Sequence, residues 1–328
     1  MRIDFHNHFY PPGYLEKLEQ WGHRYEFVSD KKRGIKIVKQ KGARFLAITP
    51  EHVSVDQRFA DMDRIGIDIQ VLTLTSPSVY FSTRKRNLYL AQMSNDFFAD
   101  LCQKYPRRFV AFGSVPLCHP EDAIKELHRM VKDLGMKGVV LGSNIDGKHL
   151  HSKEFWPFYR EVNTLHLPIF IHPMVPLHPE PFAEFVLVPL VGFCMDTTVS
   201  VAKMVFSGLF EKYPDLTMIL PHLGGVLPFL FERIDAGYKS YVECQPHITK
   251  PPSDYLKKFY YDTVSFYAPA LMCTYNAVGA DHMVMGSDYP HVIGDITRSI
   301  SSILELNISQ EEKEKILGEN GKKILNLS

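Results

Sequence analysis

The sequence predicts an α/β protein folded as one (β/α)8 barrel, and three observations support this prediction. Eight short apolar runs recur along the chain, and segments with helical character separate them. Apolar runs of about four to eight residues bounded by turn residues are typical of buried parallel strands. A chain of 328 residues with 45% apolar residues can also bury a core of the size that a barrel needs.

The strand and helix candidates alternate in chain order. We expect strands at residues 1–5, 67–74, 109–115, 136–141, 167–172, 216–222, 259–263 and 282–288. Helical segments lie between them at 87–104, 121–134, 152–165, 226–237 and 268–278, and a last helix is expected at 310–325. Strands that alternate with helices in this way form a parallel barrel, so we expect a single domain over residues 1–328.

Two segments do not fit the repeat. Residues 20–50 are rich in lysine and glycine around three short β-like runs, and they predict a small β-hairpin insertion after the first strand. In a barrel, a loop at this position falls on the active face. Residues 173–200 are rich in proline before an apolar stretch, which predicts a long loop and a packing helix.

Composition narrows the choice of partners and compartment. Thirty-seven basic and thirty-seven acidic residues leave a formal charge of zero, so no global field favours nucleic acid or an anionic membrane. The five cysteines are scattered and never spaced as C-x-x-C, which favours reduced thiols. No continuous run of about eighteen apolar residues and no secretion-type amino terminus is found. We therefore expect a soluble cytoplasmic protein that binds neither membrane nor nucleic acid.

The first strand leads into a pair of histidines. Alternate side chains of a strand share a face, so His6 and His8 are expected to project together and could bind one metal ion. Asp4 falls on the same face by this rule, and we expect it to be a buried hydrogen-bonding group. The motif alone is weak evidence, since His149 and His151 repeat it where no strand precedes them.

Polar residues also end three later strands. His172 ends the fifth strand, His222 the sixth and Asp288 the eighth. A barrel gathers the carboxyl ends of its strands on one face, which holds the active site in barrel enzymes. Three imidazoles and a carboxylate near water form a ligand set for zinc or a similar divalent ion. His222 is then either a further nitrogen ligand or a base beside the metal.

Four motifs together resemble the amidohydrolase superfamily. They lie at residues 3–8 with Pro11 following, and at 171–173, 221–225 and 286–290. More narrowly, the chain is similar to the branch of 2-amino-3-carboxymuconate-6-semialdehyde decarboxylase and related metal-dependent decarboxylases. The likeness runs over nearly the whole chain.

The resemblance implies roles for the strand-end residues. His6, His8, His172 and Asp288 are expected to bind the metal, and His222 to activate water or substrate beside it. Asp288 is also expected to take part in catalysis. The tip of the fourth strand, at 141–144, lacks the lysine that would hold a second ion, so one metal is expected. Zinc is the first choice and manganese the alternative.

Two arginines are implied to bind the substrate carboxylate. Arg44 in the insertion matches one of them, and Arg233 matches another that is supplied across a homodimer interface. A guanidinium fork suits a planar carboxylate. Two alternatives stay open, namely that Arg58 is the clamp in place of Arg44, and that Arg233 forms a surface ion pair with Glu232 or Asp235.

Two further residues are expected at the pocket. Met174 stands where the decarboxylase has a tryptophan, so the pocket wall differs, and His291 follows Asp288 closely. The predicted function is a metal-dependent decarboxylase of a small unsaturated or aromatic carboxylic acid, such as a carboxymuconate semialdehyde or a hydroxybenzoate. The alternatives are a metal-dependent hydrolase or hydratase of the same superfamily and, more remotely, a non-enzymatic zinc-stabilised scaffold. Such a scaffold would hold a closed four-ligand site.

Overall fold

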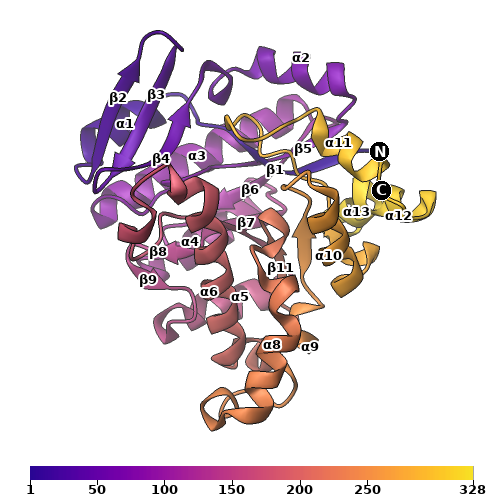
Figure 1. The fold of residues 1–328 in the computed structure, drawn as a ribbon. Helices are drawn as coiled ribbons and strands as arrows, with labels where there is room; N and C mark the ends of the chain where they lie inside the picture. The colour runs from indigo at the N-terminus through magenta and orange to yellow at the C-terminus, as the bar shows by residue number, and fades with distance from the viewer. Residues whose placement is uncertain (328) are drawn as a thin grey trace.

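Eight parallel strands form the centre of the molecule and confirm the predicted (β/α)8 barrel (Figure 1). The computed structural model describes residues 1–327, so only residue 328 of the predicted domain lies outside the description. The strands follow one another around the sheet in chain order: β1 (Ile3–His8), β5 (Ile69–Thr73), β6 (Phe109–Ser114), β7 (Gly138–Gly142), β10 (Pro168–His172), β11 (Thr217–Leu220), β12 (Tyr260–Asp262) and β13 (Met283–Val284). Each overlaps a predicted run, although several are shorter.

The barrel closes between β1 and the segment that follows β13. Backbone hydrogen bonds continue the closure beyond the end of β13. The Phe5 N–H donates to the Met285 carbonyl at 2.9 Å, and the His8 N–H donates to the Tyr289 carbonyl at 2.7 Å. This closure places Asp288 beside the imidazoles of β1.

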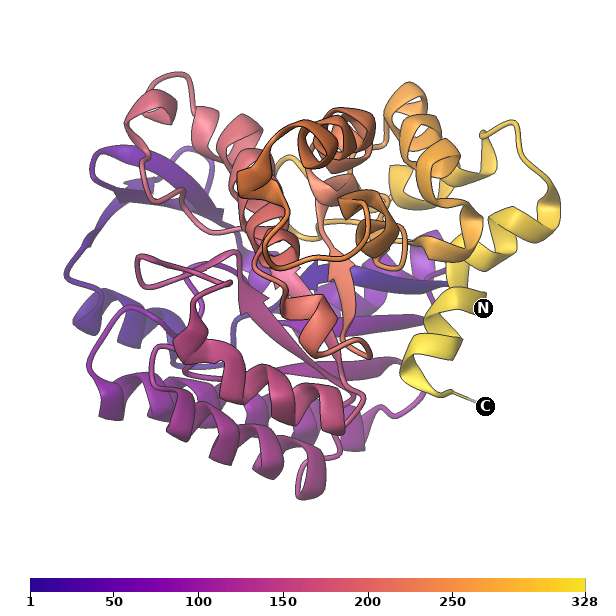
Figure 2. The same ribbon diagram turned by 90° about the horizontal axis from the view of Figure 1, so that it is seen from below.

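Helices surround the strands in both views (Figures 1 and 2). The main ones are α2 (Val55–Ile65), α3 (Arg84–Lys104), α4 (Pro120–Lys132), α5 (Trp156–Thr164), α6 (Phe193–Phe206), α8 (Leu227–Ser240), α10 (Ala268–Val278), α11 (Arg298–Leu304), α12 (Gln310–Glu314) and α13 (Asn320–Leu325). In α4, Pro120 occupies the first turn, and Ala123, Leu127 and Met130 are buried at the three- to four-residue spacing of one helix face.

A β-bulge in β1 changes the predicted direction of one side chain. Asp4 pairs with Gln70 and Asn7 pairs with Leu72, so one extra residue of β1 lies between these pairs. The Asp4 carboxylate therefore accepts hydrogen bonds from Gln70 and Ser287, at 2.9 and 2.7 Å, and does not face the metal-site imidazoles. Asp4 is buried and hydrogen-bonded as expected, but the prediction that it shares a face with His6 was wrong.

The insertion after β1 contains three strands. Helix α1 (Tyr14–Trp21) leads into an antiparallel sheet of β2 (Tyr25–Asp30), β3 (Ile35–Gln40) and β4 (Ala43–Ile48), in that order. The three predicted β-like runs become these strands, so the insertion is a small sheet and not a single hairpin. Strand β4 packs against the helical turn η4 (Val188–Gly192), which precedes α6. The insertion thereby reaches the carboxyl-terminal face of the barrel.

One stretch of the described chain has the length and composition of a membrane-spanning helix. It covers Val188–Phe206, with a mean hydropathy of 1.3 over its most apolar window. It is not a continuous apolar run, because polar residues such as Asp196 and Lys203 interrupt it. Half of that window is buried inside the protein, where α6 packs in the helical layer of the barrel, and a buried core helix passes the same test.

Candidate functional site

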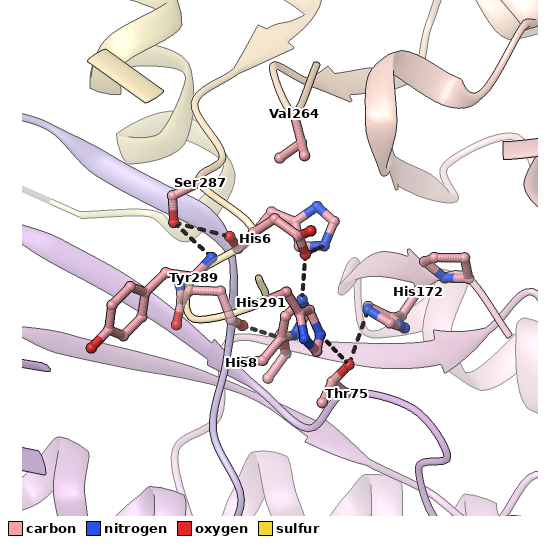
Figure 3. Close-up of polar contacts among 12 residues, drawn as sticks. His6, His8, Thr75, His172, Val264, Ser287, Tyr289 and His291 are labelled. Atoms are coloured by element: carbon pink, nitrogen blue, oxygen red, sulfur yellow. Dashed lines mark hydrogen bonds and ion pairs between the residues drawn. The ribbon is translucent and has the colours of Figure 1, made fainter. Parts of the chain in front are cut away.

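Polar side chains from four strand ends meet at the carboxyl-terminal face of the barrel. Figure 3 shows three of them, His6, His8 and His172. His6 and His8 end β1, His172 is the last residue of β10, and His222 and Asp288 follow β11 and β13. In the groups His6–His8–His172 and His6–His222–Asp288, one donor atom from each residue lies within 4.8 Å of the others. The structure thus brings together all five residues predicted from their positions at strand ends.

The protonation of Asp288, His8 and His172 suits a bound cation. Asp288 Oδ1 lies 3.3 Å from His6 Nε2 and 3.2 Å from His8 Nε2. Burial alone would raise the pKa of Asp288, but its interactions with His291, His6 and His8 hold that pKa well below its usual range. Burial also lowers the pKa of His8 and of His172. A carboxylate and neutral imidazoles are the forms that bind a divalent metal.

Asp262, the last residue of β12, is a partner of His6 that sequence reasoning missed. His6 Nδ1 donates to Asp262 Oδ2, and both side chains are fully buried. The other carboxylate oxygen accepts the backbone N–H of Val264 at 3.0 Å. Burial lowers the pKa of His6, but the carboxylates of Asp262 and Asp288 outweigh it and raise that pKa to about 10.

The free nitrogen of His6 fits a bound metal ion. Its Nε2 is buried and has no hydrogen-bond partner among residues 1–327. A histidine held by a carboxylate on its far nitrogen, with the near nitrogen free, is the usual arrangement of a metal ligand. The donor set of imidazoles and one carboxylate is also one that zinc and manganese accept.

His222 lies in a tight turn directly after β11. Its φ is +52°, and Gly225 follows at +68°. A Cβ on Gly225 would lie 2.3 Å from the Cys194 carbonyl oxygen, so the turn requires glycine at this position. His222 Nδ1 is buried without a hydrogen-bond partner in the described chain, and burial lowers the pKa of the ring. A neutral, unpartnered imidazole can bind a cation or accept a proton, so both predicted roles stay open.

Arg58 is not available as a substrate clamp. Its side chain is fully buried, and its guanidinium donates to Asn7 Oδ1 at 3.0 Å, to Gln70 Oε1 at 2.7 Å and to the His8 carbonyl. These bonds hold the end of β1 in place. The alternative that Arg58 replaces Arg44 at the substrate is therefore wrong.

A cavity opens over the histidine cluster, with a free volume of about 640 Å³ that includes its mouth. Most of its wall is apolar and comes from β4, from residues 186–193 around η4 and from the loop after Asp288. The side chains that line the wall include Phe45, Leu46, Val186, Leu190, Phe193, Val292 and Ile293. The predicted substrate residues Arg44 and His291 line the same cavity. Thr75 and Ser76 add hydroxyl groups.

Met174 and Arg233 lie outside this cavity. Met174 lines a neighbouring cavity, and its sulfur accepts a hydrogen bond from Ser76 Oγ at 3.3 Å. Arg233 is exposed on α8 and forms no ion pair within residues 1–327. Asp235, one of its predicted ion-pair partners, instead accepts a hydrogen bond from Ser253 Oγ at 2.6 Å.

The second His-x-His motif lies apart from the cluster. His149 belongs to the small hairpin of β8 (Asn144–Ile145) and β9 (Lys148–His149), and its Nε2 lies 2.8 Å from Lys203 Nζ. Neither His149 nor His151 joins a ligand group in the described chain. His149 ends a two-residue hairpin strand, so the prediction that no strand precedes this motif was wrong, and what distinguishes His6 and His8 is that their strand belongs to the barrel.

Comparison with known proteins places this site in a family. Residues 3–327 match the amidohydrolase family. The chain is 31% identical to 2-amino-3-carboxymuconate-6-semialdehyde decarboxylase of Dictyostelium discoideum, over 100% of this chain and 92% of that protein. It is 31% identical to a γ-resorcylate decarboxylase of Polaromonas sp., over 83% and 87% of the two chains.

A solved structure of a decarboxylase also has a fold similar to that of this chain. It is a dihydroxybenzoic acid decarboxylase from Polaromonas sp. with bound manganese and the inhibitor 2-nitroresorcinol. Its TM-score is 0.84 at 26% identity, and the match covers 99% of this chain and 97% of that chain. This protein belongs to the amidohydrolase family.

Proposed function

We propose that this protein is a metal-dependent decarboxylase of a small aromatic or unsaturated carboxylic acid. The observation that carries the proposal is the placement of Arg44 and of the histidine–Asp288 cluster around one largely apolar cavity. Such a cavity accommodates a flat ring, and its few polar groups can orient an acid. The relatives named above are decarboxylases of acids of this kind.

The reaction must move an electron pair and a proton. Decarboxylation breaks the bond between the carboxylate and its neighbouring carbon, releases carbon dioxide and leaves the electron pair on that carbon, which then takes up a proton. A bound divalent metal polarises substrate oxygens and stabilises this charge. His222, Asp288 and Arg44 all line the cavity. His222 and Asp288 are proposed to move the proton, and Arg44 to hold the carboxylate.

The metal is proposed to be zinc or manganese, held by His6, His8, His172 and Asp288. Manganese is bound in the Polaromonas structure, and a ligand set of nitrogens and one carboxylate accepts either ion. Elemental analysis of the purified protein, followed by chelation and reconstitution with each ion in turn, identifies the metal. Activity that survives complete metal removal would contradict the proposal.

We propose further that the active unit is a homodimer in which Arg233 reaches the cavity of the partner subunit. Arg233 is exposed and outside its own cavity, and Phe229, one helical turn earlier on the same face of α8, is 79% exposed. In a two-fold dimer, an equal mixture of Arg233→Met and His222→Asn chains contains heterodimers with one intact site. Such a mixture should regain about a quarter of wild-type activity. A monomeric protein, or no recovery, would refute this arrangement.

Product analysis tests the reaction class. The metal-loaded protein is incubated with 2,6-dihydroxybenzoate, 6-methylsalicylate, 5-carboxyvanillate and 2-amino-3-carboxymuconate-6-semialdehyde, while carbon dioxide and ultraviolet absorbance are followed. We expect release of carbon dioxide from at least one acid and none from His222→Asn. Uptake of water without carbon dioxide would instead identify a hydrolase or hydratase.

A further inference from the structure

His291 is connected to a buried histidine that has no role in the site described so far. His52 ends the short turn η1 (Pro50–His52), which follows the insertion sheet, and its side chain is fully buried. Its Nε2 lies 3.2 Å from His291 Nδ1. On the far side, His291 Nε2 lies 3.1 Å from Thr75 Oγ1, as drawn in Figure 3. A chain of polar contacts thus runs from the insertion into the cavity.

The direction of these hydrogen bonds follows from a backbone group. The Thr49 N–H lies 3.1 Å from His52 Nδ1 and can only donate, so Nδ1 is the acceptor. Burial, with His291 and Arg58 nearby, lowers the pKa of His52 well below its usual value, so the ring is neutral. A neutral ring that accepts at Nδ1 carries its proton on Nε2. His52 therefore donates to His291 Nδ1.

The hydrogen bond from His52 also determines the tautomer of His291. Because His291 accepts at Nδ1, its own proton lies on Nε2, the nitrogen that faces Thr75 and the cavity. Both nitrogens of His291 then have partners. His6 Nε2, in contrast, is buried with none in the described chain. His291 lies near His8 and Asp288, but its hydrogen bonds favour a donor role over that of a metal ligand.

Packing keeps the His52 ring in one orientation. The ring of Tyr10 stacks on it, with centroids 5.7 Å apart, and the Tyr10 N–H donates to the His52 carbonyl oxygen at 2.8 Å. Thr49 Oγ1 adds a contact to Nδ1 at 3.0 Å. A ring held on its face and at both nitrogens cannot flip without losing these contacts.

We propose that His52 is a positioning residue that fixes His291 as a hydrogen-bond donor to the substrate. This inference rests on the proposed function, because His291 lines the cavity assigned to the acid. The cavity wall is mainly apolar, and Arg44 is the group for the carboxylate. A second oxygen of the substrate then replaces Thr75 Oγ1 as the acceptor of the His291 Nε2 proton. Together, His52 and His291 select acids that carry a hydroxyl or keto oxygen beside the reacting carbon.

Substitution of His52 tests the positioning role. His52→Phe keeps a ring against Tyr10 but removes both hydrogen bonds, whereas His52→Gln keeps an amide N–H for His291. In ¹⁵N-labelled, metal-loaded protein, the ring shifts of His291, assigned by their absence in His291→Phe, should report a proton on Nε2 in the wild type and in His52→Gln. His52→Phe should show a mixture of the two tautomers. An unchanged tautomer in His52→Phe would overturn the proposal.

Ligand affinity supplies a second readout. The probes are 2-nitroresorcinol and nitrobenzene, which differ only in the two hydroxyl groups. The wild type should bind 2-nitroresorcinol more tightly than nitrobenzene. We expect the ratio of the two affinities to fall about tenfold in His52→Phe, which is the effect of one hydrogen bond, and to be unchanged in His52→Gln. The affinity ratio should fall by the same factor in His291→Phe. It should fall no further in the variant with both substitutions, because His52 acts on the ligand through His291. Equal weakening of both probes in His52→Phe would overturn the proposal.

His291→Phe leaves the buried turn intact and so keeps the test valid if His52→Phe does not fold. The tautomer is measured without turnover. A protein that releases no carbon dioxide from any acid, but whose His291 tautomer depends on His52, would refute the proposed function and support the positioning role.

Discussion

The hydrogen bond between His6 and Asp262 allows the metal site to be tested through a residue that does not touch the metal. Asp262→Asn changes one atom of a buried side chain. One amide oxygen remains to accept the Val264 N–H, now 3.0 Å from Oδ1, so the NH₂ group is placed against His6 Nδ1. That nitrogen must then accept, and the proton of the neutral ring moves to Nε2, the nitrogen that faces the metal.

The size of the effect follows from this change of tautomer. Loss of an outer partner of a metal-binding histidine lowers metal affinity by about 10- to 100-fold, which is about 1.4 to 2.7 kcal/mol. The loss of metal affinity in Asp262→Asn should lie at the upper end of this range, because the new amide both removes a negative charge and holds His6 in the wrong tautomer. Both side chains are fully buried, so solvent screens neither effect.

Competition with a chromophoric chelator measures the affinity of the protein for manganese and zinc. Asp254→Asn, an exposed site on α9 (Pro252–Leu256), is the matched control and should bind as the wild type does. Circular dichroism and thermal melting of the metal-free proteins check the fold. A metal affinity of Asp262→Asn within twofold of the wild type, in a folded protein, would show that Asp262 does not orient His6 and would refute the reasoning.

Three further predictions concern the same face of the barrel. His222→Asn should bind the metal normally and lose about 10²- to 10⁴-fold in kcat, since general acid–base groups contribute this much. If the variant lost metal affinity as well, His222 would be a metal ligand. Metal binding at pH 7.5 should release about one proton, because the Asp262 and Asp288 carboxylates raise the pKa of His6 to about 10 and its Nε2 must lose a proton to bind the ion. Calorimetry in buffers of different ionisation enthalpy measures the number of protons released. The affinity for the metal should also rise with pH. Gly225→Ala should lower the free energy of unfolding by about 2 to 4 kcal/mol, measured with urea, because a methyl group there meets the Cys194 carbonyl at positive φ. A fully stable variant would show that the turn adapts.

Residues at the ends of the apolar runs could be predicted from the sequence. His172 and Asp288 close runs whose length and apolar composition predict buried strands, and parallel strands in a barrel must present their carboxyl ends together. Their meeting with His6 follows from the topology alone. The fold and the main cluster therefore depend on patterns that are local in the chain.

Two residues of the site were missed, because their positions in the sequence do not show which side chains they contact. Asp262 is a single carboxylate at the end of an aromatic strand, and His52 is an isolated histidine in the link after the insertion. Their roles arise from partners that are remote in sequence, His6 and His291. Asp4 was misplaced for another reason, since a bulge shifts the two-residue alternation and nothing in the residues of β1 marks its position.

The closure of the barrel and the assembly of the site use the same residues. The Ser287 hydroxyl donates to Asp4 Oδ2 at 2.7 Å, and the N–H groups of Ser287 and Asp288 donate to the His6 carbonyl at 3.2 and 2.7 Å. These bonds fix Asp288 at a φ of +58°, with its carboxylate toward His6 and His8. Because His6 comes from the first strand and Asp288 follows the last, an ion bound by both would also join the two ends of the sheet. Metal binding should therefore stabilise the closed barrel itself, since a ligand that binds only the folded state raises the free energy of unfolding.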